Sequence, residues 1–186
     1  GLGDKAGPLV FQFPPAPRDI LHDPAGWVER LGVFLEALPR AVAGRAPLYA
    51  VELRNPELLT PRLMRMLREA GVRYVVGLHD RMPSVARQLN ALRVLDDCPQ
   101  GPYVPSGPVI VRWNLRPGFR YEEAKDRYFP FNRLVDEDPD TRQALALLAR
   151  DVLALGQPIW IVANNKAEGS APVTLLALYE ALAALG

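Results

Sequence analysis

The sequence predicts an α/β fold built on a parallel β-sheet, and two observations support this. Segments with apolar residues at helical spacing alternate with strand-like segments, which is typical of a parallel sheet. Five strand-like segments are short and rich in β-branched and aromatic residues: PLVFQF (8–13), LYAVELR (48–54), RYVVGLH (73–79), VIVRWN (109–114) and IWIVANN (159–165).

The apolar character of most of these segments is nearly continuous, which indicates parallel strands that are covered on both faces. Trp27 and Trp160 are also expected to lie in the core. Trp113 alternates with Arg112 along its segment, and successive side chains of a strand point to opposite faces. We expect Trp113 to pack outward beneath a helix, and Arg112 to point the other way.

Recognisable start signals precede several of the predicted helices. Thr60, Asp140 and Ser170 are of the type that caps a helix N-terminus, and Pro61 suits the first helical position. A proline there loses nothing, because its missing N–H would have no partner within the helix. The predicted helices cover residues 27–42, 61–71, 84–95, 141–156 and 171–186.

Length and composition indicate one ordinary globular domain covering residues 1–186. The net charge of +1 gives no indication of nucleic-acid binding, and no apolar segment approaches the roughly 20 residues that span a membrane. Cys98 is the only cysteine and the N-terminal residues lack a signal pattern, so we expect a cytoplasmic protein. Nearly all basic residues are arginines, which weakens arguments from any single arginine.

Polar residues gather where the predicted strands end. A doubly wound sheet and a barrel both fit the strand–helix alternation, but neither a G-x-G-x-x-G nor a P-loop motif follows any strand. In (β/α)₈ barrels the active site is built from the C-terminal strand ends, and a wet mouth would explain so many polar groups. The residues at these ends are Gln12, Glu52, Arg54, His79, Asp80, Arg112, Asn114, Asn164 and Asn165.

Four stretches resemble the YecE-like family, also known as domain of unknown function 72. They are GPLVFQFPP (7–15), YAVELRNPELL (49–59), VRWN with the following RYEEA (111–124), and VANNKAEGSAPVTLLAL (162–178). The resemblance implies a TIM-type (β/α)₈ barrel without an established activity. It also implies that the chain begins near the fourth strand, so that it would be a fragment with about five βα units.

One departure from the family pattern concerns a histidine. Many members carry Arg-x-His-Gly after the seventh strand, where this chain has Arg112, Trp113, Asn114 and Leu115. Any role of that histidine is therefore absent from this chain.

Glu52 and Arg54 form the strongest candidate pair, since side chains two apart on a strand share a face. Glu52 could act as a base or ligand while Arg54 holds an anionic group, or the two could form a structural ion pair. Arg112 would face the same cavity, and two arginines at one mouth suit phosphate, carboxylate or sugar-acid recognition. The alternative is that Arg112 is neutralised by Glu52, by Asp80 or by a carboxylate from the missing part of the barrel.

The other candidates have weaker signals. His79 could serve as acid, base or metal ligand, and Asp80 is a doubtful second acid that could instead cap the loop. Asn164 and Asn165 could bind hydroxyl or carbonyl groups, or shape their own loop, and Lys166 would strengthen anion binding there. Asn114 shares the face of Arg112. Gln12 and Tyr121 could also reach the mouth.

Two functions remain open. One is an enzyme acting on a small anionic or polyhydroxylated substrate, and the other is a non-catalytic protein that binds a sugar-like or anionic ligand or a partner. No cofactor is indicated, and two histidines without H-x-H or H-x-x-x-H spacing give poor support for a metal. The environment of Glu52 separates the functions. An enzyme should hold Glu52 in a concave pocket, with a perturbed pKa and room for a substrate atom, whereas a binding or structural role predicts saturation by Arg54 or Arg112.

Overall fold

The computed structural model describes residues 3–116 and 118–186, with the side chain of Asp4 left out. Its centre is a five-stranded sheet in which the strands stand side by side in chain order and every neighbouring pair is parallel. This confirms the α/β fold and the five predicted strands. Their bounds are β1 (Leu9–Gln12), β2 (Tyr49–Glu52), β3 (Arg73–Leu78), β4 (Val109–Trp113) and β5 (Ile159–Ala163).

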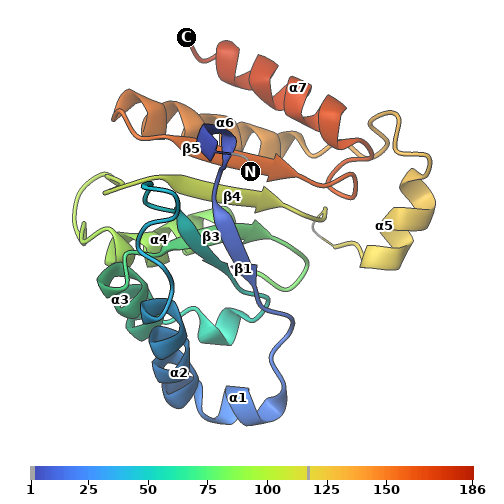
Figure 1. Cartoon of the computed structure of the whole chain (residues 1–186). Helices are drawn as coiled ribbons and strands as arrows, with labels where there is room; N and C mark the ends of the chain where they lie inside the picture. Colours follow the sequence, from blue (N-terminus) through green and yellow to red (C-terminus); the bar gives the residue numbers. More distant parts are fainter. Residues whose placement is uncertain (1–2, 117) are drawn as a thin grey trace.

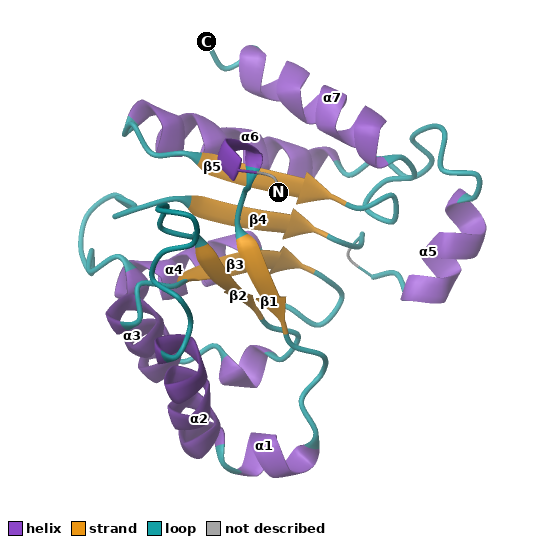
Figure 2. Ribbon diagram, in the orientation of Figure 1, coloured by secondary structure: helices purple, strands orange, loops and turns teal. Residues whose placement is uncertain are grey.

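Helices follow the strands and pack along the sheet (Figures 1 and 2). A helix lies between each pair of consecutive strands, and α5 stands apart beyond the arrowhead of β4. Short 3₁₀ turns cover Gly3–Lys5 and Pro56–Leu58. The helices are α1 (Arg18–His22), α2 (Pro24–Glu36), α3 (Pro61–Glu69), α4 (Val85–Leu95), α5 (Tyr121–Tyr128), α6 (Pro139–Ala154) and α7 (Ala171–Ala183).

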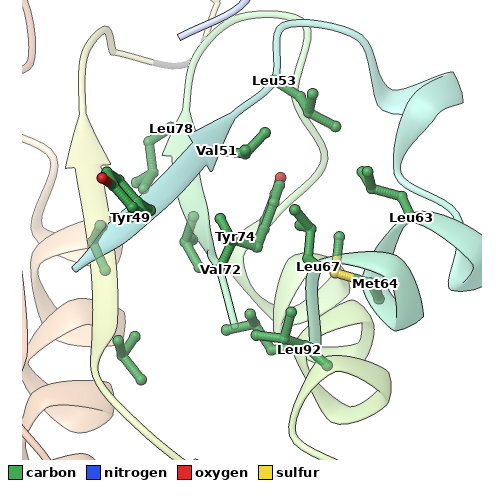
Figure 3. Close-up of a cluster of buried hydrophobic side chains, with 14 of the residues drawn as sticks. Tyr49, Val51, Leu53, Leu63, Met64, Leu67, Val72, Tyr74, Leu78 and Leu92 are labelled. Carbon is green, nitrogen blue, oxygen red and sulfur yellow. The ribbon is translucent and has the colours of Figure 1, made fainter. Parts of the chain in front are cut away.

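The two faces of the sheet carry different side chains. One face packs against the helices and forms the main core, in which Val51 and Tyr74 lie close to Leu63 and Leu67 of α3 (Figure 3). Trp113 belongs to this core and is fully buried, as its alternation predicted. The other face carries a small apolar cluster of Ala50, Val75 and Ile110, with Val10 and Leu48 packed against it.

Trp160 corrects the expectation that it lies in the core. It is 41% exposed, and Val162 two residues later is 50% exposed. Trp160 pairs with Ile110 in the sheet register, so it shares the face of the small apolar cluster. Because β5 is an edge strand, its side chains on this face have fewer neighbours, although the chain at Gly7 lies so near that a Cβ added there would stand 3.1 Å from the Trp160 ring. Trp27, by contrast, is buried as expected.

The helix starts agree with the sequence in part. Thr60 caps α3 by accepting a hydrogen bond from the Leu63 N–H (3.3 Å), as predicted. The cap of α6 is Asp138, and the prediction of Asp140 is wrong. Pro139 suits the first helical position, so the helix begins two residues earlier than the apolar pattern suggests.

One further helix differs from the expectation at both ends, and one predicted cap residue makes no capping hydrogen bond. The helix expected over 27–42 begins at Pro24 and ends at Glu36, since Pro39 cannot continue it. Ser170 is the N-cap of α7 but its side chain makes no capping hydrogen bond. Asn165 supplies that bond instead, because its Oδ1 accepts from the Ala171 N–H at 2.8 Å.

The sheet opens between β2 and β3 near the end where the candidate site lies. Register pairs join the two strands only at Ala50–Arg73 and Val51–Tyr74. Beyond them the buried side-chain amide of Gln88 bonds both the N–H (3.0 Å) and the carbonyl (2.9 Å) of Gly77. Gln88 thereby satisfies backbone groups that would otherwise be buried without partners. None of the helices in the described residues is long and apolar enough to cross a membrane.

Candidate functional site

Glu52, the last residue of β2, is the centre of the candidate site, and its side chain is completely buried. Arg54 Nη2 lies 3.0 Å from Oε1, and Arg112 Nη1 is paired with Oε2. Asn114 Nδ2 donates a hydrogen bond of 3.1 Å to Oε1. The strand alternation that placed these four side chains on one face therefore brings them into direct contact.

Gln12 joins the same network from β1. It stands beside Glu52 in the sheet register, and its Oε1 accepts a 2.8 Å hydrogen bond from Arg112 Nη1. The ends of β1, β2 and β4 thus meet through side chains at one edge of the sheet. We name Gln12, Glu52, Arg54, Arg112 and Asn114 the Glu52 cluster.

The charges of the Glu52 cluster do not cancel. Two guanidinium groups share one carboxylate, so the cluster keeps an excess of positive charge. The side chain of Arg54 is 12% exposed and that of Arg112 is 26% exposed, so Arg112 reaches solvent more readily. A buried carboxylate is costly unless its charge and lone pairs are satisfied, and here three donors satisfy it.

His79 and Asp80 follow β3 beside this cluster. Burial lowers the pKa of His79, and the nearby positive charge of Arg54 lowers it further, while the Asp80 carboxylate acts in the opposite direction. The imidazole is therefore neutral at neutral pH. Its Nδ1 touches the Asp80 carboxylate without making a hydrogen bond, and the Asp80 side chain is 30% exposed.

The loop after β5 uses its two asparagines for its own shape. Asn164 Oδ1 accepts from the Lys166 N–H at 3.0 Å. Asn165 Oδ1 accepts from the Ala171 N–H at 2.8 Å, and its carbonyl accepts from the Gly169 N–H at 2.8 Å. Of the two uses that the sequence left open for these side chains, the described contacts are those of a loop-shaping role.

Lys166 lies in this loop and is only 8% exposed. Its ammonium stands 4.1 Å from the centre of the Tyr121 ring and 5.8 Å from that of Phe131. Tyr121, at the start of α5, is 54% exposed. It thus lies over the β5–α7 loop against Lys166, and within the described part of the chain its side chain makes no hydrogen bond or ion pair to the Glu52 cluster.

Glu168 is a buried charged residue that the sequence reasoning missed. Its Oε1 accepts from the Asp138 N–H and from Arg142 Nη2, both at 2.6 Å. Its carbonyl accepts from the Val135 N–H at 2.8 Å, so it ties the β5–α7 loop to the segment before α6. The signal available in the sequence was a charged residue directly before Gly169, within a segment otherwise read as a loop.

One cavity of the described residues borders the Glu52 cluster. It has a volume of about 570 Å³ and runs along the edge of β1 beside Phe11, Phe13 and Phe34, and Gln12 is the one residue of the Glu52 cluster that lines it. No group of three or more histidine, cysteine, aspartate or glutamate side chains in the described part of the chain could hold a metal ion.

The comparison with protein families gives one clear result. The family model described as "Protein of unknown function DUF72" matches residues 1–185. This chain belongs to the DUF72 family. YecE-like is another name for the same family, so the resemblance seen in the sequence motifs is confirmed. No curated protein matches the chain.

Two solved DUF72 structures share the fold. A DUF72 family protein from Thermotoga maritima matches with a TM-score of 0.62 at 18% identity, over 97% of this chain and 59% of that protein. A DUF72 family protein from Enterococcus faecalis matches with a TM-score of 0.53 at 15% identity, over 94% of this chain and 57% of that protein. This DUF72 chain therefore spans less than two thirds of the length of either structure.

Proposed function

We propose that this DUF72 chain forms five consecutive βα units of a (β/α)₈ barrel within a single domain, and that the mouth of the barrel binds a small anionic ligand. The observation that carries the ligand is the pair of guanidinium groups, from Arg54 and Arg112, on one carboxylate. Guanidinium groups suit phosphate and carboxylate because their N–H donors match two oxygens at once.

The strand order supports the barrel. The strands run in chain order without any reversal, whereas a doubly wound sheet reverses its order at a switch point and binds its ligand there. The Glu52 cluster lies at the C-terminal ends of parallel strands, which is where barrel ligands bind. A barrel of this kind requires strands beyond the five described, because five cannot close it.

Glu52 supports binding better than catalysis. Its carboxylate already contacts Arg54, Arg112 and Asn114, so about three of its roughly four acceptor sites are occupied and little of it is left open to a substrate proton. In this proposal Glu52 holds the two guanidinium groups at one place before the ligand arrives. Preorganisation of this kind lowers the cost of ordering long side chains on binding.

An enzyme is the second candidate, and His79 is the residue that favours it. A neutral imidazole beside Arg54 could take a proton from an anionic or polyhydroxylated substrate that Arg54 holds. Asp80 touches that imidazole and would orient it rather than act as a second acid. We place both functions in the cytoplasm, since Cys98 is the only cysteine of the chain.

Thermal unfolding of the intact protein with a set of ligands tests the proposal. Phosphate, sulfate and sugar phosphates should raise the melting temperature, and uncharged sugars should not, since a ligand at 100 times its Kd adds about 2.7 kcal/mol to stability. Arg112→Lys should reduce this rise although the charge is kept. Arg62→Lys is the matched control, because Arg62 forms an exposed pair with Glu29 on a remote helix surface.

The same ligands separate the two functions. For a binding protein, His79→Gln should leave ligand affinity and the bound ligand unchanged. For an enzyme, the native protein should convert one of the stabilising ligands, and His79→Gln should bind that ligand without converting it. Equal stabilisation of native protein and Arg112→Lys would contradict the anion site in both cases.

A further inference from the structure

Gln12 contributes a neutral amide to the Glu52 cluster. It is the last residue of β1, stands beside Glu52 in the sheet register, and is exposed. Its Oε1 accepts a 2.8 Å hydrogen bond from Arg112 Nη1, the same nitrogen that is paired with Glu52 Oε2. The guanidinium group of Arg112 is thus held between a carboxylate and an amide.

The contact with Arg112 fixes the direction in which the Gln12 amide faces. A guanidinium group has donors and no acceptor, so only the oxygen of the amide can face it. The amide nitrogen therefore faces away from that contact, and within the described part of the chain it donates no hydrogen bond. Because Gln12 is exposed, both N–H donors of this nitrogen are open to a ligand.

An amide at position 12 also preserves the charge of the site. Two guanidinium groups share the Glu52 carboxylate, which leaves one positive charge in excess. A second carboxylate beside Arg112 could accept the same hydrogen bond, but its charge would cancel that excess. Gln12 therefore holds Arg112 in position without neutralising the anion site.

Donors for a ligand thus come from three strand ends that are linked by direct contacts. Gln12 ends β1, Arg54 follows β2 and Arg112 belongs to β4. Gln12 bonds Arg112, and Arg112 and Arg54 share Glu52. A carboxylate presents two oxygens in one plane, whereas a phosphate or sulfonate group presents three oxygens around one face. Three donor groups therefore suit a tetrahedral anion better than a planar one.

We infer that Gln12 Nε2 is a third donor of the anion site and makes it selective for tetrahedral oxyanions, such as the phosphate group of a monoester, over carboxylates. This inference rests on the proposed function and adds the class of ligand to it.

Calorimetric titration of the intact protein with methanesulfonate and acetate tests the third donor. The two ions have the same charge and the same methyl group, and they differ in having three oxygens or two. The intact protein should bind methanesulfonate more tightly. Gln12→Met should weaken methanesulfonate binding about tenfold, which corresponds to about 1.4 kcal/mol for a lost hydrogen bond to a charged group, and should leave acetate binding within about twofold.

A charge-swap variant tests the role of the neutral amide. Gln12→Glu keeps the shape of the side chain, and it should weaken both ions by more than about tenfold because its carboxylate cancels the excess charge. Gln100→Glu is the control. Gln100 is exposed in the loop before β4, at the opposite end of the strands, and this variant should bind both ions as the native protein does.

Equal effects of Gln12→Met on the two ions would overturn the third donor and leave the arginine site standing. The exposed position of Gln12 should allow this variant to fold. If it does not fold, native methanesulfonate affinity in Gln12→Glu would by itself overturn the inference. Binding of neither ion by the native protein would overturn the proposed anion site together with the third donor.

Discussion

Glu52 is a charged residue at the end of β2 whose side chain is fully buried, and its contacts explain why a carboxylate is tolerated there. Water does not reach its side chain, and two guanidinium groups and one amide take the place of water. Such a carboxylate gives little net stability compared with an apolar residue, but removing it leaves its partners unpaired. It also brings the guanidinium groups of Arg54 and Arg112 together on one carboxylate.

Removal of the Glu52 charge should therefore destabilise the protein strongly. We expect Glu52→Gln to lower the free energy of unfolding by roughly 3 kcal/mol, the lower end for a broken buried pair, because Arg112 reaches solvent. Glu29→Gln removes an exposed partner of Arg62 and should cost at most about 1 kcal/mol. Urea unfolding measures both. A loss of equal size in the two variants would show that the Glu52 pair is not buried in solution.

At the scale of elements, the β5–α7 loop presses closely against the segment before α6. Gly169 has φ +125, and a Cβ at this position would stand 2.5 Å from the Arg133 carbonyl oxygen. Gly169→Ala should lose more than about 2 kcal/mol through backbone strain and collision together. Gly156→Ala is the control: φ is +72 with no atom within 4 Å of the added Cβ, so only the roughly 1 kcal/mol of strain applies. Equal losses in thermal unfolding would contradict the close contact.

A second set of contacts, made by Asp96 at the end of α4, joins this helix to the segments where β3 and β4 begin. The Asp96 carboxylate accepts hydrogen bonds from Arg73 Nη1, from the Tyr103 hydroxyl and from the Ser106 hydroxyl, each at 2.6 Å. Burial by itself raises the pKa of Asp96, but the hydrogen bonds from these three residues and the charge of Arg73 outweigh it and hold the pKa below its ordinary value.

The pH dependence follows from the direction of that shift. A depressed carboxyl pKa stabilises the fold above the unfolded pKa of about 3.9, and the contribution is lost as pH falls through the folded value. The native protein should be more stable than Asp96→Asn at pH 7, and the difference should shrink only below about pH 4. Chemical unfolding of both proteins at a series of pH values measures this difference in the free energy of unfolding. A difference that stays constant down to pH 2 would rule out the Asp96 carboxylate as its source.

At the scale of the whole molecule, the sequence predicts what is local. Strand positions, the Thr60 cap and the shared face of Glu52 and Arg54 follow from short-range patterns, and the structure agrees. The sequence did not reveal the buried role of Glu168, because its partner Arg142 lies 26 residues away along the chain. The exposure of Trp160 was not predicted, because strand alternation determines the face on which a side chain lies but not whether another element covers that face.

The meeting of Arg54 and Arg112 is a property of the whole sheet, since it joins the ends of β2 and β4 across β3. A structure of the intact protein, determined from crystals grown in phosphate, tests the anion site most directly. We predict a phosphate whose oxygens lie within about 3 Å of both guanidinium groups. Phosphate bound only elsewhere on the surface, with Arg54 and Arg112 still holding Glu52 and no anion beside them, would contradict the site.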